Sequence, residues 1–234
     1  MVPRPDDAPP DAGTVAVLFS AGLDSAVLLA FAAREAASVQ PIYVSAGLAW
    51  EDEELAAAER LLDAGVLGES VRPLETLHVD MRDVYSEGHW AVRGEPPAAG
   101  TPDEDVCLDG RNIVLLAKAS VFMASAGIHR IFIGPLSGNP FPDATPAFFQ
   151  AMAHALTLGL DSPIIIEAPF LGVRKPDVIR LGLSLGVPLD MTISCMQPRE
   201  GIHCGHCSKC RERTDAFREA DVEDTAPYQQ AAGS

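Results

Sequence analysis

Short apolar blocks alternate along the chain with longer segments that have a helical pattern. The first block, residues 15–19, runs without polar alternation, which is typical of a strand buried in a parallel sheet. Further strands are predicted at residues 41–45, 74–79, 131–134 and 164–166. Helices are predicted from residue 26 onward and at residues 51–63, 113–126, 146–158, 174–186 and 211–220.

This order of elements predicts the fold class. Strands that alternate with helices indicate a parallel sheet with right-handed crossovers. We expect an α/β fold with a doubly wound, mostly parallel, Rossmann-like sheet of about five strands. The expected organisation is a disordered, Pro- and Asp-rich lead-in at residues 1–13, a nucleotide-binding domain at residues 14–190 and a small zinc module at residues 191–228.

The turn between the first strand and the first helix, residues 20–25, is a candidate anion site. Its small residues let backbone N–H groups face a ligand, and the following helix presents its positive end. The hydroxyls of Ser20 and Ser25 can add donors, and Asp24 or Ser25 can cap the helix. No lysine follows Gly22, so the turn is not a Gly-Lys-Ser/Thr loop. An ordinary strand-turn-helix is the alternative interpretation.

Other candidates follow strand ends, where ligands bind in such sheets. Residues 45–50, with Ser45 and Gly47, are a candidate wall for adenine or substrate. Gly134 ends a strand at a point where the backbone can approach a nucleotide. The Pro- and Gly-rich residues 135–145 that follow it are the candidate substrate loop.

Two helix starts carry basic residues that can reach phosphate. At one of them, Arg111 and Asn112 can hold phosphate, or Arg111 can pair with Asp109 while Asn112 caps the helix. At the other, Lys175 precedes a first turn that contains Pro176. Lys175 can reach a phosphate or lie on the solvated surface.

The composition narrows the classes of function. A chain of 234 residues with 47% hydrophobic content can bury a full core. It has no apolar run of about 18 residues and no basic, apolar leader, so we expect a cytoplasmic protein that does not enter a membrane. The formal net charge of −16 opposes loose binding of nucleic acid. The composition therefore favours a small substrate or a protein.

Four of the five cysteines form the most specific signal in the chain. Their spacing is Cys195-x8-Cys204-x2-Cys207-x2-Cys210, which suits tetrahedral zinc. An iron–sulfur cluster is the main competitor. Four sulfur ligands would close the site, so its expected role is to fold the C-terminal segment. The remaining cysteine, Cys107, lies far from this group in the sequence.

Several motifs together resemble the 7-cyano-7-deazaguanine synthase family from about residue 14 to residue 228. They are the loop at residues 20–25, Gly110-Arg111-Asn112, Pro142-Asp143, Lys175 with residues 185–188, and the segment from Ser194 to Cys210. The loop resembles the Ser-Gly-Gly-x-Asp-Ser loop of the PP-loop ATP pyrophosphatases, which cleave ATP between the α- and β-phosphates and transfer AMP. The family is a zinc-containing ligase of queuosine biosynthesis that uses ATP and ammonia to convert 7-carboxy-7-deazaguanine through its amide to the nitrile.

The resemblance implies roles for individual residues. ATP, with Mg²⁺, would be bound by Phe19, Ser20, Ala21, Gly22, Leu23, Asp24, Ser25, Ala26, Val27, Leu28, Leu29, Ser45, Gly47, Asn112 and Gly134. The catalytic residues would be Ser20, Asp24, Ser25, Arg111 and Lys175. Zn²⁺ would be held by Cys195, Cys204, Cys207 and Cys210. The implied partners are a small carboxylate substrate of the deazapurine type and ammonia, and the implied assembly is a homodimer.

The chain departs from that family at three places. Ala21 replaces a usual glycine, at a cost of roughly 1–2 kcal/mol if its φ is positive. Residues 45–50 read Ser-Ala-Gly-Leu-Ala-Trp where the family has Asp-Tyr-Gly-Gln-Arg-His, and the loop at residues 136–145 keeps only Pro142-Asp143 of a longer acidic loop. Asp143 or backbone groups would then have to recognise the substrate. A divergent ligase for another acid and amine, an RNA-thiolating enzyme and a nucleotide sensor stay open as alternatives.

Overall fold

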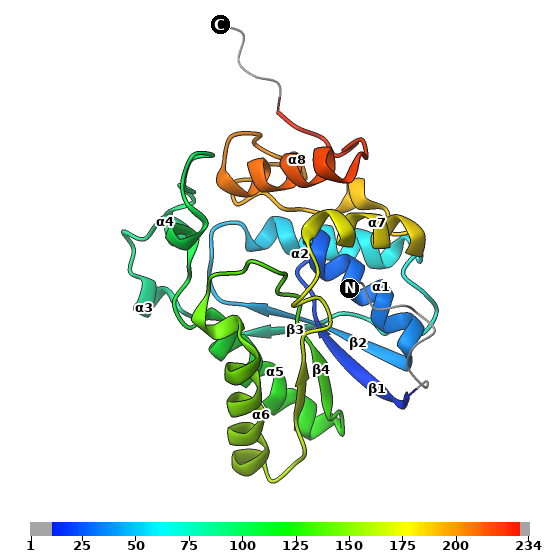
Figure 1. The fold of residues 1–234 in the computed structure, drawn as a ribbon. Helices are drawn as coiled ribbons and strands as arrows, with labels where there is room; N and C mark the ends of the chain where they lie inside the picture. The colour runs from blue at the N-terminus through cyan, green and yellow to red at the C-terminus, as the bar shows by residue number, and fades with distance from the viewer. Residues whose placement is uncertain (1–10, 230–234) are drawn as a thin grey trace, which may run out of the picture.

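A five-stranded parallel sheet forms the centre of the molecule (Figure 1). The computed structural model describes residues 11–229. The strands are β1 (Asp11–Leu18), β2 (Ala36–Ser45), β3 (Glu75–His78), β4 (Arg130–Phe132) and β5 (Ile165–Glu167). Their order is β3-β2-β1-β4-β5, and every neighbouring pair is parallel. The doubly wound parallel sheet predicted from the sequence is therefore confirmed.

Helices cover both faces of this sheet (Figure 1). One face carries α1 (Leu23–Glu35), α2 (Glu51–Asp63) and α7 (Lys175–Leu185), with α8 (Ser208–Ala220) packed on α7. The other face carries α5 (Arg111–Ala126) and α6 (Pro146–Leu160). Because the strands are parallel, the carboxyl ends of β1, β2 and β4 lie at the same edge of the sheet, between the two layers of helices.

The burial of β1 explains why its sequence lacks polar alternation. Val15 and Val17 belong to the core under α1, α2, α7 and α8, whereas Ala16 belongs to the core under α5 and α6. Successive side chains of a strand point to opposite faces, so a strand covered on both faces needs apolar residues at every position. A third cluster packs Trp50, Tyr85 and Ala91 against the four clustered cysteines.

Two strands begin earlier than the sequence predicts. β1 begins at Asp11, inside the expected lead-in, while residues 1–10 of that lead-in lie outside the described part of the chain. β2 begins at Ala36 rather than at residue 41. Val39 pairs there with Val15 of β1, and its N–H donates to the carbonyl oxygen of Ser70. The first residues of these strands are held by hydrogen bonds to distant parts of the chain. Such contacts leave no clear pattern in the local sequence, so the sequence did not predict them.

Three segments also differ from expectation. The sequence of residues 81–109, with Pro96-Pro97 and several glycines, predicts a long irregular loop. The structure has two one-turn helices there, α3 (Arg82–Tyr85) and α4 (Trp90–Arg93), and a 3-10 turn, η1 (Asp103–Val106). α8 begins at Ser208 rather than at residue 211, because Cys207 is its N-cap. The sequence predicts a frayed end at residues 225–234, but residues 225–229 are held by backbone hydrogen bonds between His203 and both Pro227 and Gln229.

Candidate active site and metal centre

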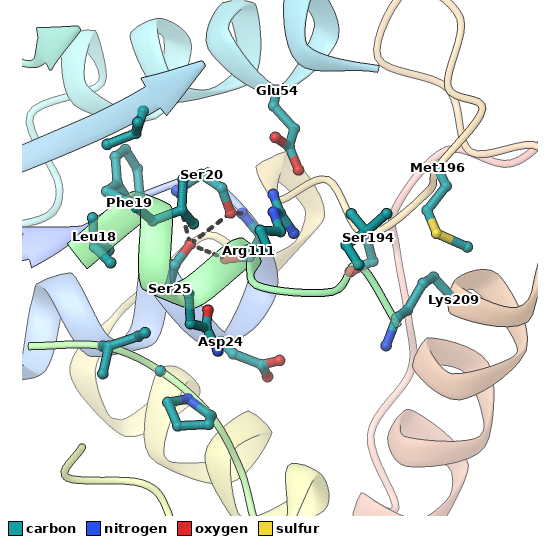
Figure 2. A pocket seen from close by; sticks show the side chains of 18 of the residues that line it. Leu18, Phe19, Ser20, Asp24, Ser25, Glu54, Arg111, Ser194, Met196 and Lys209 are labelled. Carbon is teal, nitrogen blue, oxygen red and sulfur yellow. Dashed lines mark hydrogen bonds between the residues drawn. The ribbon is translucent and has the colours of Figure 1, made fainter. Parts of the chain in front are cut away.

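A cavity of about 330 Å³ opens at the carboxyl ends of β1, β2 and β4 (Figure 2). Phe19 follows β1, Val44 lies near the end of β2 and Gly134 follows β4. This is the edge at which ligands bind in open α/β sheets. Its polar and aromatic lining includes Ser20, Asp24, Ser25, Tyr43, Trp50, Glu54, Trp90, Arg111, Asn112, Asp143, Ser194 and Lys209.

The loop between β1 and α1 is held by its two serines. The Ser25 hydroxyl donates to the carbonyl oxygen of Gly22 at 3.0 Å and accepts from the Ser20 N–H at 3.3 Å. α1 begins at Leu23 with Gly22 as N-cap and no side-chain cap. The expected cap from Asp24 or Ser25 is therefore wrong, because Ser25 already bonds within the loop and Asp24 pairs elsewhere. The first-turn N–H groups stay available to an anion.

The predicted ATP-binding segment divides into two groups. Phe19, Ser20, Gly22, Asp24 and Ser25 line the cavity. The other six are buried in the core: Ala21, Leu23, Ala26, Val27, Leu28 and Leu29. Beyond its first turn α1 packs into the core, so the side chains of these six do not reach the cavity. The part of the segment that faces the cavity is thus its loop and first helical turn.

Ala21 has a φ of +56°, the conformation in which a non-glycine residue is strained. Its methyl group is fully buried, and its carbonyl oxygen accepts a hydrogen bond of 2.9 Å from the N–H of Ile193. This bond joins the anion loop to the segment that leads into the cysteine cluster. The sequence predicted backbone strain at Ala21 if its φ is positive, and the structure meets this condition.

Asp24 and Lys175 form an ion pair at the rim of the cavity. The Lys175 ammonium lies 3.0 Å from one oxygen of Asp24 and 2.7 Å from Glu212 of α8, and Glu212 also pairs with Lys209 at 2.7 Å. Burial alone would lower the pKa of Lys175, but Asp24 and Glu212 raise it above its ordinary value. Conversely, Lys175 and Lys209 overcome the effect of burial and lower the pKa of Glu212 to about 2. Lys175 and Glu212 therefore stay charged at neutral pH.

Lys175 lies outside the main cavity. It lines a neighbouring hollow that shares Asp24, Gly134 and Lys209 with the cavity. Its ammonium reaches the cavity rim through Asp24, so contact between Lys175 and a phosphate stays a prediction. The second oxygen of Asp24, Oδ1, is buried and has no hydrogen-bond partner in the described part of the chain.

Arg111 and Asn112 begin α5 and have separate roles. Asn112 donates its backbone N–H to Asp143 Oδ2 at 2.9 Å and its side-chain amide to Asp143 Oδ1 at 3.2 Å. Asp143, not Asn112, thus satisfies the start of this helix. Arg111 points into the cavity between Ser20 and Glu54 (Figure 2). Its Nε is buried and has no hydrogen-bond partner among residues 11–229, so the alternative pairing with Asp109 is not observed.

Ser45 and Gly47 point away from the cavity. The buried carboxylate of Glu51 accepts hydrogen bonds from the Ser45 hydroxyl at 2.7 Å and from the Gly47 N–H at 3.0 Å. Within the expected wall, Trp50 alone lines the cavity. It stacks on Trp90 with ring centroids 5.7 Å apart and planes 11° from parallel.

Sequence reasoning missed Glu54 and Trp90. Glu54 is one of four acidic residues in the first turn of α2, which is the usual appearance of a solvated face. It stands four positions after Trp50 and four before the buried Ala58, so helical periodicity could have placed it on the inner face. Trp90 lies in α4, whose single turn gives no periodic signal.

Glu54 is an unusual carboxyl group. The hydroxyl of Tyr43 donates to its Oε2 at 3.0 Å. Burial raises the pKa of Glu54 to about 7, although Arg111, Tyr43 and Trp50 oppose this change. Burial also raises the pKa of Tyr43, which keeps its hydroxyl protonated as a donor. Glu54 therefore changes charge near neutral pH.

The four clustered cysteines are brought together as a metal site. Their Sγ atoms all lie within 4.8 Å of one another, with 4.0 Å between Cys195 and Cys207 and 3.9 Å between Cys204 and Cys210. Zinc–sulfur bonds of about 2.3 Å place tetrahedral sulfurs about 3.8 Å apart, so one ion fits this set. A multi-iron cluster distributes its ligands over several metals and requires wider spacing.

Backbone hydrogen bonds support a thiolate at Cys195. Backbone N–H groups of Gln197 and Cys204 donate to Cys195 Sγ at 3.2 and 3.3 Å. The neighbouring thiols of Cys195 and Cys210 lower the pKa of the Cys207 thiol. The interleaved His203 is not a ligand, because its Nε2 accepts the N–H of Ser194 at 3.1 Å. His206 bonds to the carbonyl oxygen of Cys204.

Two further observations concern Cys107 and the helices. The Cys107 thiol lies beside Asp109, and burial together with this carboxylate raises its pKa, which makes Cys107 a poor nucleophile. Between residues 11 and 229, no helix combines the length and the apolar character needed to cross a membrane.

A parallel sheet covered by helices on both faces, with a loop after its first strand that lines the cavity and a four-cysteine site, defines an α/β protein of the Rossmann-like type. The family model described as "Queuosine biosynthesis protein QueC" matches residues 14–221. The chain belongs to this family, as the resemblance of its motifs predicted.

Two relatives that are named 7-cyano-7-deazaguanine synthase support this assignment. A 7-cyano-7-deazaguanine synthase from Methanothrix thermoacetophila is 33% identical over 225 residues, which cover 93% of this chain and 99% of the relative. Another from Anaeromyxobacter dehalogenans is 33% identical over 227 residues, covering 93% and 97%. Among solved structures, NMN synthetase from Francisella tularensis aligns at 16% identity and a TM-score of 0.41, covering 95% of this chain and 80% of that one.

Proposed function

We propose that the protein is an ATP-dependent C–N ligase that converts 7-carboxy-7-deazaguanine to 7-cyano-7-deazaguanine with ammonia as nitrogen donor. The observation that carries this proposal is one cavity in which an anion loop, Arg111 and a base-sized aromatic wall lie together. The substrate class is that of the 7-cyano-7-deazaguanine synthases to which the chain is similar.

The reaction would use ATP twice. A carboxylate oxygen attacks the α-phosphorus of ATP and pyrophosphate leaves; ammonia then attacks the acyl carbon, and AMP leaves to give the amide. A second ATP activates the amide oxygen in the same way, and loss of AMP and protons gives the nitrile. Both activations separate AMP from pyrophosphate, so negative charge must be held on the leaving group.

Residues of the cavity match these requirements. The N–H groups at the start of α1 and the hydroxyls of Ser20 and Ser25 would bind the pyrophosphate. Arg111, whose guanidinium enters the cavity beside Ser20, would stabilise charge on the phosphates. Asp24 Oδ1, a buried oxygen without a partner among the described residues, suits Mg²⁺ bound to ATP.

We further propose that the four cysteines hold Zn²⁺. The compact set of sulfurs is what supports this choice over a cluster. When bound, zinc would cross-link Cys195 to α8 and fix the start of that helix, which carries Lys209 and Glu212 to the cavity rim. The raised pKa of Cys107 argues against the RNA-thiolating alternative, which calls for a reactive cysteine.

Product analysis tests the function directly. Purified protein is incubated with ATP, ammonium and 7-carboxy-7-deazaguanine, and AMP, pyrophosphate and the mass of the base are followed. The expected products are AMP, pyrophosphate and the nitrile, and Asp24→Asn should abolish their formation. ADP and orthophosphate as main products would contradict the proposal. AMP formation with other carboxylic acids only would favour the divergent ligase.

A further inference from the structure

A guanine-type base presents two adjacent donors, a ring N–H and the 2-amino group. An ionised carboxylate accepts two parallel hydrogen bonds and matches such an edge. Three acidic side chains line the cavity: Asp24, Glu54 and Asp143. Asp24 is paired with Lys175 beside the anion loop, and both oxygens of Asp143 accept hydrogen bonds from Asn112. Glu54 is the remaining acceptor.

Glu54 is held in position and still has free hydrogen-bond acceptor sites. Tyr43 donates one hydrogen bond to it, whereas a carboxylate can accept about four. Trp50 also stacks on Trp90, and both indoles line the same cavity. A carboxylate beside a pair of parallel indoles offers an acceptor pair and a flat apolar surface to a planar ligand.

We propose that Glu54, with the Trp50–Trp90 pair, forms the subsite for the donor edge of a guanine-type base. The identity of the ring rests on the proposed function. A base bound in this way directs its 7-substituent away from Glu54, toward the rest of the cavity, where the anion loop lies. Arg111 lies between Glu54 and Ser20 and would separate the base subsite from the phosphate subsite (Figure 2).

The charge of Glu54 sets which edge it can bind. The ionised form accepts two donors, as a guanine-type base requires, whereas the protonated form offers one donor and one acceptor, which matches adenine. The groups that face Glu54 are Tyr43 from β2, Glu51 and Trp50 at the start of α2, and Arg111 from α5. Burial raises the pKa of Glu54 to about 7, so affinity for a guanine-type base should increase as pH rises through 7.

Isothermal titration calorimetry with two bases tests the subsite. The probes are 7-deazaguanine and 7-deazahypoxanthine, which lacks the 2-amino group. At pH 8 the unaltered protein should bind 7-deazaguanine about ten- to a hundredfold more tightly, the value of one hydrogen bond to a charged group. In Glu54→Gln the preference should fall to about threefold or less, with ATP affinity retained. The matched control is Glu59→Gln, an exposed position on the same helix.

The outcomes are distinct. An unchanged preference in Glu54→Gln, or no preference in the unaltered protein, would overturn the subsite. A loss of ATP affinity in Glu54→Gln with base binding intact would also overturn it and assign Glu54 to adenine. Failure of 7-carboxy-7-deazaguanine to turn over, with the preference for 7-deazaguanine present and Glu54-dependent, would reject the proposed reaction and leave the subsite standing.

Discussion

Ala21 shows how one position balances backbone strain against packing. The left-handed conformation costs an alanine about 1–2 kcal/mol relative to glycine. Against this, its buried methyl group contributes about 0.8 kcal/mol, and alanine loses less conformational entropy on folding than glycine, by about 0.4–1 kcal/mol. The opposing effects are of similar size, which explains why the chain tolerates alanine where its family usually has glycine.

We therefore expect Ala21→Gly to change the free energy of unfolding by no more than about 1 kcal/mol in either direction. Urea unfolding monitored by circular dichroism measures this change. Ala21→Val is the contrasting variant, since a β-branched side chain is strained further in this conformation, and it should cost more than about 2 kcal/mol. A gain above 2 kcal/mol in Ala21→Gly would show that the methyl group contributes no packing.

Glu54 should make the stability depend on pH. Its pKa is raised from 4.5 to about 7 in the folded protein, so between these values the unfolded chain releases a proton that the folded chain keeps. Stability should thus fall as pH rises from about 4.5 to 7, by up to about 3 kcal/mol from this group, less what residual solvent contact screens.

Glu54→Gln removes that titration. The variant should unfold with nearly the same free energy as the unaltered protein at pH 5 and should be more stable at pH 8. Urea unfolding at both pH values measures the difference, with Glu59→Gln as control. Equal stability of the Glu54→Gln variant and the unaltered protein at pH 8 would contradict a raised pKa of Glu54.

At the scale of elements, the start of α5 depends on a residue from another segment. Asp143 accepts the N–H of Asn112 and its side-chain amide, so it caps α5 from the loop after β4. Asp143→Ala leaves a partly buried N–H unpaired and should lower the free energy of unfolding by about 1–3 kcal/mol. Asp143→Asn keeps an acceptor and should lose less. Thermal and urea unfolding of the two variants measure this order.

The variants Asp143→Ala and Asp143→Asn also distinguish two roles for Asp143, substrate recognition and capping of α5. If Asp143 recognised the substrate, as the sequence suggested, both variants would weaken base binding strongly and Asp143→Asn would stay stable. With the carboxylate committed to Asn112, loss of stability should instead be the main effect. Base affinity, measured by calorimetry on folded Asp143→Asn, should change by less than about threefold.

Local patterns in the sequence predict the elements that carry their own signal. α2 matches its predicted residues because acidic residues begin it and apolar ones repeat with helical period. The one-turn helix α4 and the early part of β2 carry no such signal, since tertiary contacts hold them. The same limit applies to the site: the loop motif and cysteine spacing are local, whereas Trp90 and the Asp143 cap depend on which segments the fold brings together.

At the scale of the whole molecule, the metal module and the anion loop are connected by two short links. The N–H of Ile193, two residues before Cys195, bonds to the carbonyl oxygen of Ala21. Glu212, two residues after Cys210, bonds to Lys175 and through it to Asp24. Both links lie two residues from one of the clustered cysteines, so a metal held by these cysteines would keep parts of the anion loop in place.

Removal of the metal should therefore affect nucleotide binding as well as stability. Protein treated with a chelator, and the variant Cys207→Ser, should lose the bound zinc, unfold at lower temperature and bind ATP about tenfold more weakly, the effect of losing one hydrogen bond to a charged group. Elemental analysis, thermal unfolding and calorimetry measure the three effects. Arg218→Ala, an exposed change on the same helix, should alter none of them. Metal-free protein that stays folded and binds ATP with undiminished affinity would show that the two links do not position the anion loop.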